Sequence, residues 1–150
     1  MVGRQRHLGG ADEEDGATRE QARNLAVAAL LVEVLRADYD VAGSERRQVA
    51  SSIGGILGLD AAQCEELLVE AEQQVDRAHD LHQFTTAVNR ELTHDEKQQL
   101  VEQMWRVAQA DAIVHKYEEH LIRRVADLLH VRHSDFIAAK LRTTGATNRD

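Results

Sequence analysis

The chain has 150 residues, of which 43% are hydrophobic, so it is long enough for one domain with a single moderate core and too apolar for a disordered chain. The absence of proline and an aromatic content of only 3% favour helices throughout. A formal net charge of −8 argues against a nucleic-acid partner, because phosphate contacts require a basic surface. The single cysteine, Cys64, excludes an intramolecular disulfide and fits a reducing compartment.

The two ends of the chain are predicted to be tails. Residues 1–17 are polar, contain glycine and lack periodicity, so we expect a mobile N-terminal tail before a domain over residues 18–143, and residues 144–150 form a C-terminal tail. The N-terminal residues lack the apolar segment of a signal peptide. The most apolar run, Leu25–Leu35, is too short to span a bilayer and contains Glu33. A cytoplasmic protein is therefore expected.

Capping signals mark the predicted helix starts, since an N-cap side chain followed three positions later by Gln or Glu is typical of a capping box. The pairs are Thr18–Gln21, Asp60–Gln63, Asp80–Gln83 and Thr93–Glu96. With the apolar spacing, these pairs predict seven helices and no strands. Two helices are expected over about 19–37 and 44–57, three begin after Asp60, Asp80 and Thr93, and two are expected over about 116–129 and 134–142. The first helix is apolar nearly all the way round, so we expect it at the centre.

The sequence repeats itself. An offset of 73 positions aligns Asp38 with Asp111 and Glu45 with Glu118, and apolar residues around both pairs align as well. Each half is then a helix, an acidic turn, a helix, a short turn and a helix, with the fourth helix between the halves. The predicted fold is all-α: a single compact bundle of two pseudo-twofold-related three-helix halves joined by a linker helix.

The repeated acidic residues have a structural interpretation. Each aspartate ends a helix, and each glutamate lies in the first turn of the next helix, where the helix dipole favours a negative charge. A complete capping box would require a good N-cap residue three positions before each glutamate. Those positions hold Ala42 and His115, which are poor N-caps, so capping explains the glutamates only in part.

The alternative interpretation is a divalent metal site, since carboxylates around a tight turn can hold a hard cation. In the first turn Asp38, Asp40 and Glu45 could converge. The segment "DYDVAG" copies the start of an EF-hand loop, but the later ligand positions hold Ala42 and Val49, which excludes an EF-hand.

The second turn offers a mixed set of ligands. Asp111 and Glu118, with His115 and Glu119, would supply oxygen and nitrogen and would suit zinc or another transition metal better than calcium. In either turn, waters, backbone carbonyls or the other repeat would have to complete the coordination.

A long apolar helix, the pattern A-D-x-x-(apolar)-x-x-x-E in both turns, and the segments "EEHLIRRVADLL" and "DFIAAKLR" together resemble the TerB-like family of tellurite-resistance-associated proteins. The resemblance covers about Leu25 to Arg142. It implies two similar three-helix halves, a bacterial stress or tellurite-resistance context, membrane-linked complexes and divalent-metal binding at the acidic turns. Related domains occur beside J-domains, whose His-Pro-Asp signature this proline-free chain lacks.

The chain departs from the family turn, A-D-G-x-(apolar)-D-x-x-E, at two positions in each repeat. Tyr39 and Ala112 replace the glycine, which at such a helix end usually takes a left-handed conformation. Ala42 and His115 replace the second aspartate, so each turn has lost one carboxylate. The ligands carried over are Asp38, Glu45, Asp111 and Glu118, with Asp40 as a local substitute.

Two functions follow from these patterns. The first is a non-enzymatic TerB-like stress-response module that binds Ca²⁺, Mg²⁺, Mn²⁺ or Zn²⁺ at its acidic turns. The second is a metal-free scaffold that works by protein–protein interaction or by forming a homodimer. Protein partners, a membrane-associated complex among them, are expected in place of nucleic acid. No Ser-His-Asp or Cys-His arrangement has a local signature, so we expect no enzyme.

Three further features were assigned from their spacing. Trp105 points away from the main apolar stripe of its helix, so it either packs on the linker helix or lies on an exposed partner surface. Gly54 and Gly55 either weaken their helix or let another element approach closely. Cys64 lies on an apolar face and is expected in the core.

Overall fold

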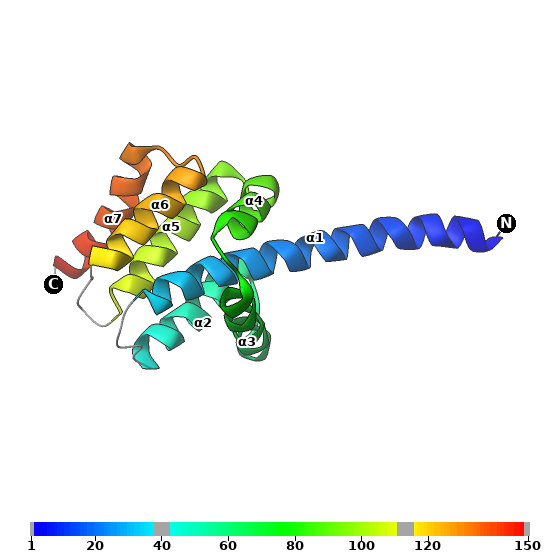
Figure 1. Ribbon diagram of the computed structural model, residues 1–150, viewed down its shortest axis with the longest axis horizontal. Coiled ribbons are helices and arrows are strands. Elements are labelled where there is room, and N and C mark those ends of the chain that lie inside the picture. The colour runs from blue at the N-terminus through cyan, green and yellow to red at the C-terminus, as the bar shows by residue number, and fades with distance from the viewer. Residues whose placement is uncertain (1, 38–42, 111–115, 149–150) are drawn as a thin grey trace.

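The computed structural model describes residues 2–37, 43–110 and 116–148, and these ranges form seven helices and no strand. The helices are α1 (Val2–Arg36), α2 (Gly43–Leu57), α3 (Ala61–Arg77), α4 (His82–Glu91), α5 (His94–Ala108), α6 (Lys116–Leu128) and α7 (His133–Asn148). Figure 1 shows a bundle from which the N-terminal part of α1 projects. The predicted all-α fold with seven helices is confirmed. None of the helices in the described ranges has the length and apolar character needed to cross a bilayer.

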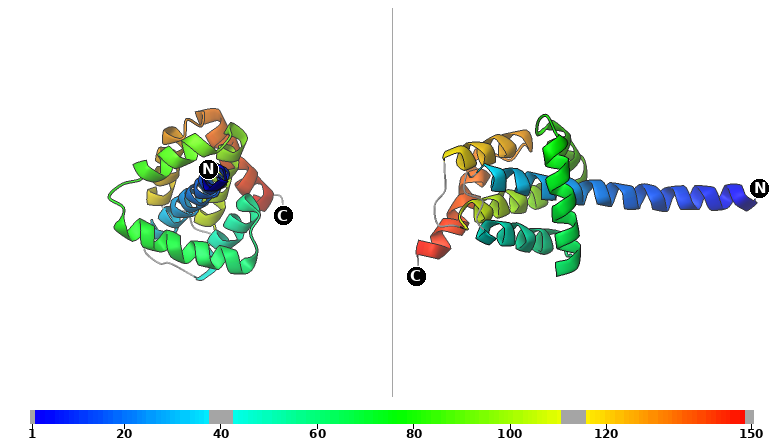
Figure 2. Two further views of the ribbon diagram at one scale, coloured as in Figure 1. Left: turned by 90° about the vertical axis from the view of Figure 1, so that its right-hand side faces the viewer. Right: turned by 60° about the horizontal axis from the view of Figure 1, so that its bottom comes forward.

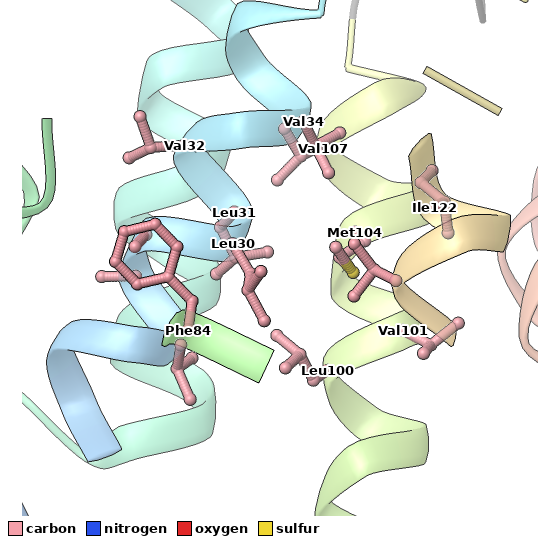
Figure 3. Packing of buried hydrophobic residues seen from close by; sticks show 14 of the residues in the cluster. Leu30, Leu31, Val32, Val34, Phe84, Leu100, Val101, Met104, Val107 and Ile122 are labelled. Atoms are coloured by element: carbon pink, nitrogen blue, oxygen red, sulfur yellow. The ribbon is translucent and has the colours of Figure 1, made fainter. Parts of the chain in front are cut away.

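Helix α1 forms the centre of the bundle. Its segment Ala26–Leu35 is buried, with every apolar residue in it at most 2% exposed, because this stretch is apolar on all sides. The segment packs against α2, α3, α4, α5 and α6. Figure 2 shows the other helices arranged around α1, and Figure 3 shows Leu30 and Leu31 pointing toward apolar side chains of α5. The predicted central helix is therefore observed.

Two of the predicted capping boxes are present. The Gln63 amide donates to the Asp60 carboxylate at 2.8 Å, and the Asp60 amide donates to the Gln63 side chain at 3.0 Å. The Glu96 amide donates to the Thr93 hydroxyl at 3.2 Å, and the Thr93 amide donates to the Glu96 side chain at 2.8 Å. These side chains satisfy amides that have no partner within the helix, so they set the starts of α3 and α5.

The other two predicted helix starts differ from the structure. Asp80 accepts a hydrogen bond from the His82 amide at 2.9 Å, but the N-cap residue of α4 is Leu81, so no Asp80–Gln83 box forms. Leu81 is buried, and its packing places the helix start one residue later than the polar pattern predicts.

Thr18 lies inside α1, which begins at Val2, so most of the predicted N-terminal tail is helical. Extending an existing helix costs much less than nucleating one, and no proline interrupts this segment. In the same way α7 continues to Asn148, beyond its predicted end at Arg142. The mobility of both tails stays a prediction.

The packing of the helices matches the internal repeat. Among the pairs formed by these six helices, exchanging α1, α2 and α3 with α5, α6 and α7 leaves the set of packed pairs unchanged. The pairs α1–α3 and α5–α7 correspond, as do α1–α2 and α5–α6, α2–α3 and α6–α7, and α2–α5 and α1–α6. Helix α4 packs on α1 in addition. The pseudo-twofold axis itself stays a prediction, but these contacts are those that such an axis would require.

Gly54 permits a close approach between α2 and the start of α3. A Cβ atom at this position would lie 3.3 Å from the Cys64 sulfur and 3.3 Å from the Leu59 carbonyl oxygen. Cys64 is buried, and burial, with a smaller effect of the Asp60 charge, raises the pKa of its thiol. The assignment of Cys64 to the core is confirmed.

Of the two alternatives for Trp105, the exposed partner surface is wrong. The indole is fully buried, and its ring centroid lies 5.4 Å from that of Phe136 on α7. The ammonium of Lys140 lies 5.1 Å from the indole centroid, within range of a cation–π interaction. Trp105 lies off the main stripe of α5 because α7 covers that second face.

The central position of α1 predicts a large cost for truncating one of its side chains. The substitution Leu30→Ala should lower the free energy of unfolding by about 2–5 kcal/mol, because Leu30 is fully buried and the cavity collapses only in part. The control Val69→Ala, at a side chain that is 43% exposed, should change it by less than about 0.5 kcal/mol. Urea denaturation measures both, and equal costs would contradict a core centred on α1.

Candidate metal centre

The structure describes one of the five predicted ligand side chains. Asp38, Asp40 and Asp111 lie outside the described residues, as does the side chain of Glu45, whose backbone belongs to the first turn of α2. Glu118 is described in full and lies in the first turn of α6. The geometry of the candidate site is therefore built from Glu118 and from the helix ends on either side of the turns.

Glu118 is fully buried. Among the residues whose burial the structure describes, it is the only charged side chain in the buried class, where it stands with apolar residues and the hydroxyls of Ser52, Thr85 and Thr143. Removing a carboxylate from water is costly unless opposite charge, hydrogen bonds or a metal ion compensate. Glu118 makes interactions of its own within the fold, and the amino-terminal end of α6 adds the favourable helix dipole to them.

The neighbouring Glu119 has a different environment. Its side chain is exposed, and it forms an ion pair with Lys140 of α7 at 3.1 Å. It is therefore held at the surface between α6 and α7. Of the two consecutive glutamates in this turn, Glu118 is the one whose position suits a buried cation.

A hollow of about 400 Å³ lies between the C-terminal end of α1 and the N-terminal end of α6. Ala37, which directly precedes the first turn, lines this hollow together with Tyr117, which directly precedes Glu118. Its remaining lining residues are Glu33, Arg36 and Leu121. Figures 1 and 2 show the C-terminal end of α1 and the N-terminal end of α6 at the same end of the bundle. The fold thus brings residues next to both acidic turns to one place.

Glu33 adds a carboxylate to the wall of this hollow. Burial raises the pKa of its carboxyl group above the ordinary value of 4.5, and the charge of Arg36 offsets part of that effect. Arg36 also forms an ion pair with Asp76 and donates to the Glu72 carbonyl of α3 at 3.2 Å. Sequence reasoning did not identify Glu33 as a site residue, although a single acid within the apolar run Leu25–Leu35 is the signal that could have found it.

The described residues supply part of a coordination sphere. Within the described ranges no three His, Cys, Asp or Glu side chains are grouped so that they could hold a metal ion. The histidines at the spacings His79–His82 and His130–His133 are exposed. A hard cation needs about six oxygens, so any centre here would require the carboxylates of the turns in addition to Glu118. The donor set fits a cation in one respect, namely a fully buried carboxylate at the residue that follows Tyr117, which lines the hollow.

The protein belongs to the class of all-helical bundles built from an internally repeated sequence, with an acidic segment in each repeat. The family model for tellurite resistance protein TerB matches residues 24–141, and the chain belongs to this family. The resemblance to the TerB-like family, which rests on the apolar helix, the two acidic turns and two later segments, is therefore confirmed. Comparison with curated proteins and with solved structures gives no match.

The environment of Glu33 predicts a pH-dependent stability. Because burial raises its pKa in the folded state, Glu33 stabilises the fold most below its ordinary pKa of 4.5, and this contribution is lost as the pH rises through the folded value. In chelator-treated protein, Glu33→Gln should therefore raise the free energy of unfolding at pH 7, and the gain should shrink as the pH approaches 4.5.

Urea denaturation over this pH range measures the effect, with Glu66→Gln as the control because Glu66 is an exposed acid on α3. A loss of stability on Glu33→Gln at neutral pH, or a gain that does not depend on pH, would contradict this assignment.

Proposed function

We propose that this chain is a non-enzymatic, cytoplasmic TerB-family protein of the bacterial tellurite and stress response, and that its acidic turns bind a divalent cation. The observation that carries the proposal is the complete burial of the Glu118 carboxylate in the first turn of α6. A cation would bind this buried carboxylate as an oxygen ligand, in addition to the interactions that Glu118 makes within the fold.

The hollow between α1 and α6 supports a shared site over two separate ones. Ala37, at the end of α1, and Tyr117, in the first turn of α6, both line it, so the chain enters the first acidic turn near the residue that precedes Glu118. A cation held by Glu118 and Asp111, with Asp38, Asp40 or Glu45 from the other repeat, would join the two halves of the sequence. Such a cation would stabilise the contact between α1 and α6.

The chemistry of the ligands limits the choice of metal. Carboxylate oxygens suit Ca²⁺, Mg²⁺ and Mn²⁺, whereas participation of His115 would favour Zn²⁺ or another transition metal. The protein's own contribution would be to hold the carboxylates in place and to keep water from the buried side of Glu118. Binding and release of the ion would then change the stability of the bundle without any chemical step.

A metal-free scaffold is the second candidate, and a different observation favours it. Ile137 and Leu141 lie one turn apart on α7 and are 37% and 61% exposed. A protein partner, a membrane-associated complex or a second copy of the chain could cover such a surface. Under this function the acidic turns would only shape the helix ends.

Calorimetric titration of the chelator-treated protein with Ca²⁺, Mg²⁺, Mn²⁺ and Zn²⁺ tests the proposal. We expect saturable binding of at least one ion, and we expect Glu118→Gln to abolish it because the negative charge of the buried ligand is lost. Glu119→Gln is the matched control: it removes the same charge from the next residue, which is exposed and paired with Lys140. This control should bind as the unchanged protein does.

Thermal unfolding provides a second readout, since an ion that binds only the folded state raises the melting temperature. The bound ion should raise it in the unchanged protein and in Glu119→Gln, but not in Glu118→Gln. The double substitutions Asp38→Asn/Glu45→Gln and Asp111→Asn/Glu118→Gln then show which repeat supplies the ligands. No binding of any of the four ions at about millimolar concentration, the weak end of protein calcium sites, would refute cation binding.

A further inference from the structure

A groove between α6 and α7 forms a second feature of the molecule, separate from the acidic turns. Its volume is about 370 Å³, and its apolar lining consists of Phe136 and Ile137 of α7. Its polar lining comes from α6, with Glu119, His120 and Arg123. Leu141, one turn beyond Ile137, is 61% exposed and extends the apolar surface along α7.

The charge of this groove is opposite to that of the protein as a whole. Glu119 is neutralised by its ion pair with Lys140. Arg123 is exposed, and no described residue forms an ion pair with it. The groove therefore combines apolar lining residues with the positive charge of Arg123, which lies outside the ion pairs of the described residues, in a chain with a net charge of −8. An occupant with acidic and apolar residues would complement both properties.

The N-terminal arm of α1 (residues 2–17) carries such residues. It projects from the bundle in Figures 1 and 2, and Thr18, which directly follows the arm, lines a cavity together with Leu59, Leu67 and Glu70. The arm contains Leu8 and the run Asp12–Asp15, which holds four consecutive acids. At 1.5 Å per residue its length is about 24 Å, enough to reach a neighbouring molecule.

The arm also has a physical reason to dock. Isolated helices of about this length are marginal in water, and most helices are stabilised by packing. The arm holds four glycines, at positions 3, 9, 10 and 16, each of which costs a helix roughly 0.5–1 kcal/mol relative to alanine. A surface that covers the arm would supply the missing stabilisation.

We propose that the arm of one copy binds in the α6–α7 groove of a second copy, with its acidic run against Arg123. Reciprocal exchange of two arms would give a closed dimer, whereas one-way binding would give a longer assembly. Because α1 runs without interruption from the arm into the centre of the bundle, docking would also join the two molecules through their most buried helix. This contact does not depend on cation binding.

Light scattering coupled to size exclusion tests the proposal on the full-length protein. At about 0.05 M salt, where screening is weak, the mass should be at least twice the 16.8 kDa of one chain, and it should fall toward one chain at about 0.5 M salt. Arg123→Glu should give a monomer at low salt, as should the arm variant with Asp12, Glu13, Glu14 and Asp15 all changed to Lys. Combining both changes should restore the assembly, because the charges attract again.

Arg47→Glu is the matched control, since Arg47 is an exposed arginine of α2 that forms no ion pair with the described residues. It should leave the mass of the assembly unchanged. Circular dichroism establishes that each variant keeps its helices. A monomeric unchanged protein at low salt would overturn the proposal. An assembly that persists in Arg123→Glu, or in the arm variant, would overturn it as well.

Discussion

The structure depends on the burial of one helix. The segment Ala26–Leu35 of α1 is apolar on all sides, so it has no face that could be left in water, and five other helices pack around it. This constraint decides the arrangement of the bundle. Helix α5, its counterpart in the second repeat, packs directly against it, and the remaining helices of both repeats pack on these two. The C-terminal end of α1 and the N-terminal end of α6, which flank the two acidic turns in the sequence, then lie at one end of the molecule.

That arrangement gives the buried charge its meaning. A carboxylate in the first turn of a helix ordinarily lies at the surface, where the helix dipole stabilises its negative charge. Glu118 departs from this pattern because it is fully buried, and the hollow that adjoins its turn is lined by the end of α1. Glu33 and Arg36 on the same end of α1 show that polar groups are grouped where the two repeats meet. A divalent cation is the simplest group that would compensate several carboxylates at such a position.

The sequence predicted what depends on local interactions and missed what depends on neighbours. The capping boxes at Asp60 and Thr93 involve residues three positions apart, so their side chains identify the helix starts. The sequence did not predict the packing of Trp105 on α7. The periodicity of α5 identifies one apolar face of this helix, whereas α7 covers a second face that contains Trp105. The repeat singles out Glu118 because it aligns with Glu45, but the sequence does not show that Glu118 is buried and Glu119 exposed, since the packing of α6 decides this. The sequence did not predict the polar part of α1 that precedes Thr18. A helix propagates from a packed segment into residues that would not form a helix alone.

The most direct test of a cation at the acidic turns is a crystal structure of the protein grown with Mn²⁺, whose anomalous scattering marks the ion. The account predicts an anomalous peak at coordination distance from a Glu118 oxygen. Further ligands should come from the acidic turns, next to the C-terminal end of α1. A map without a peak near Glu118, or a peak bound only by exposed carboxylates such as Glu119, would contradict it. Glu118 would then be a buried carboxylate that serves only the packing of α6.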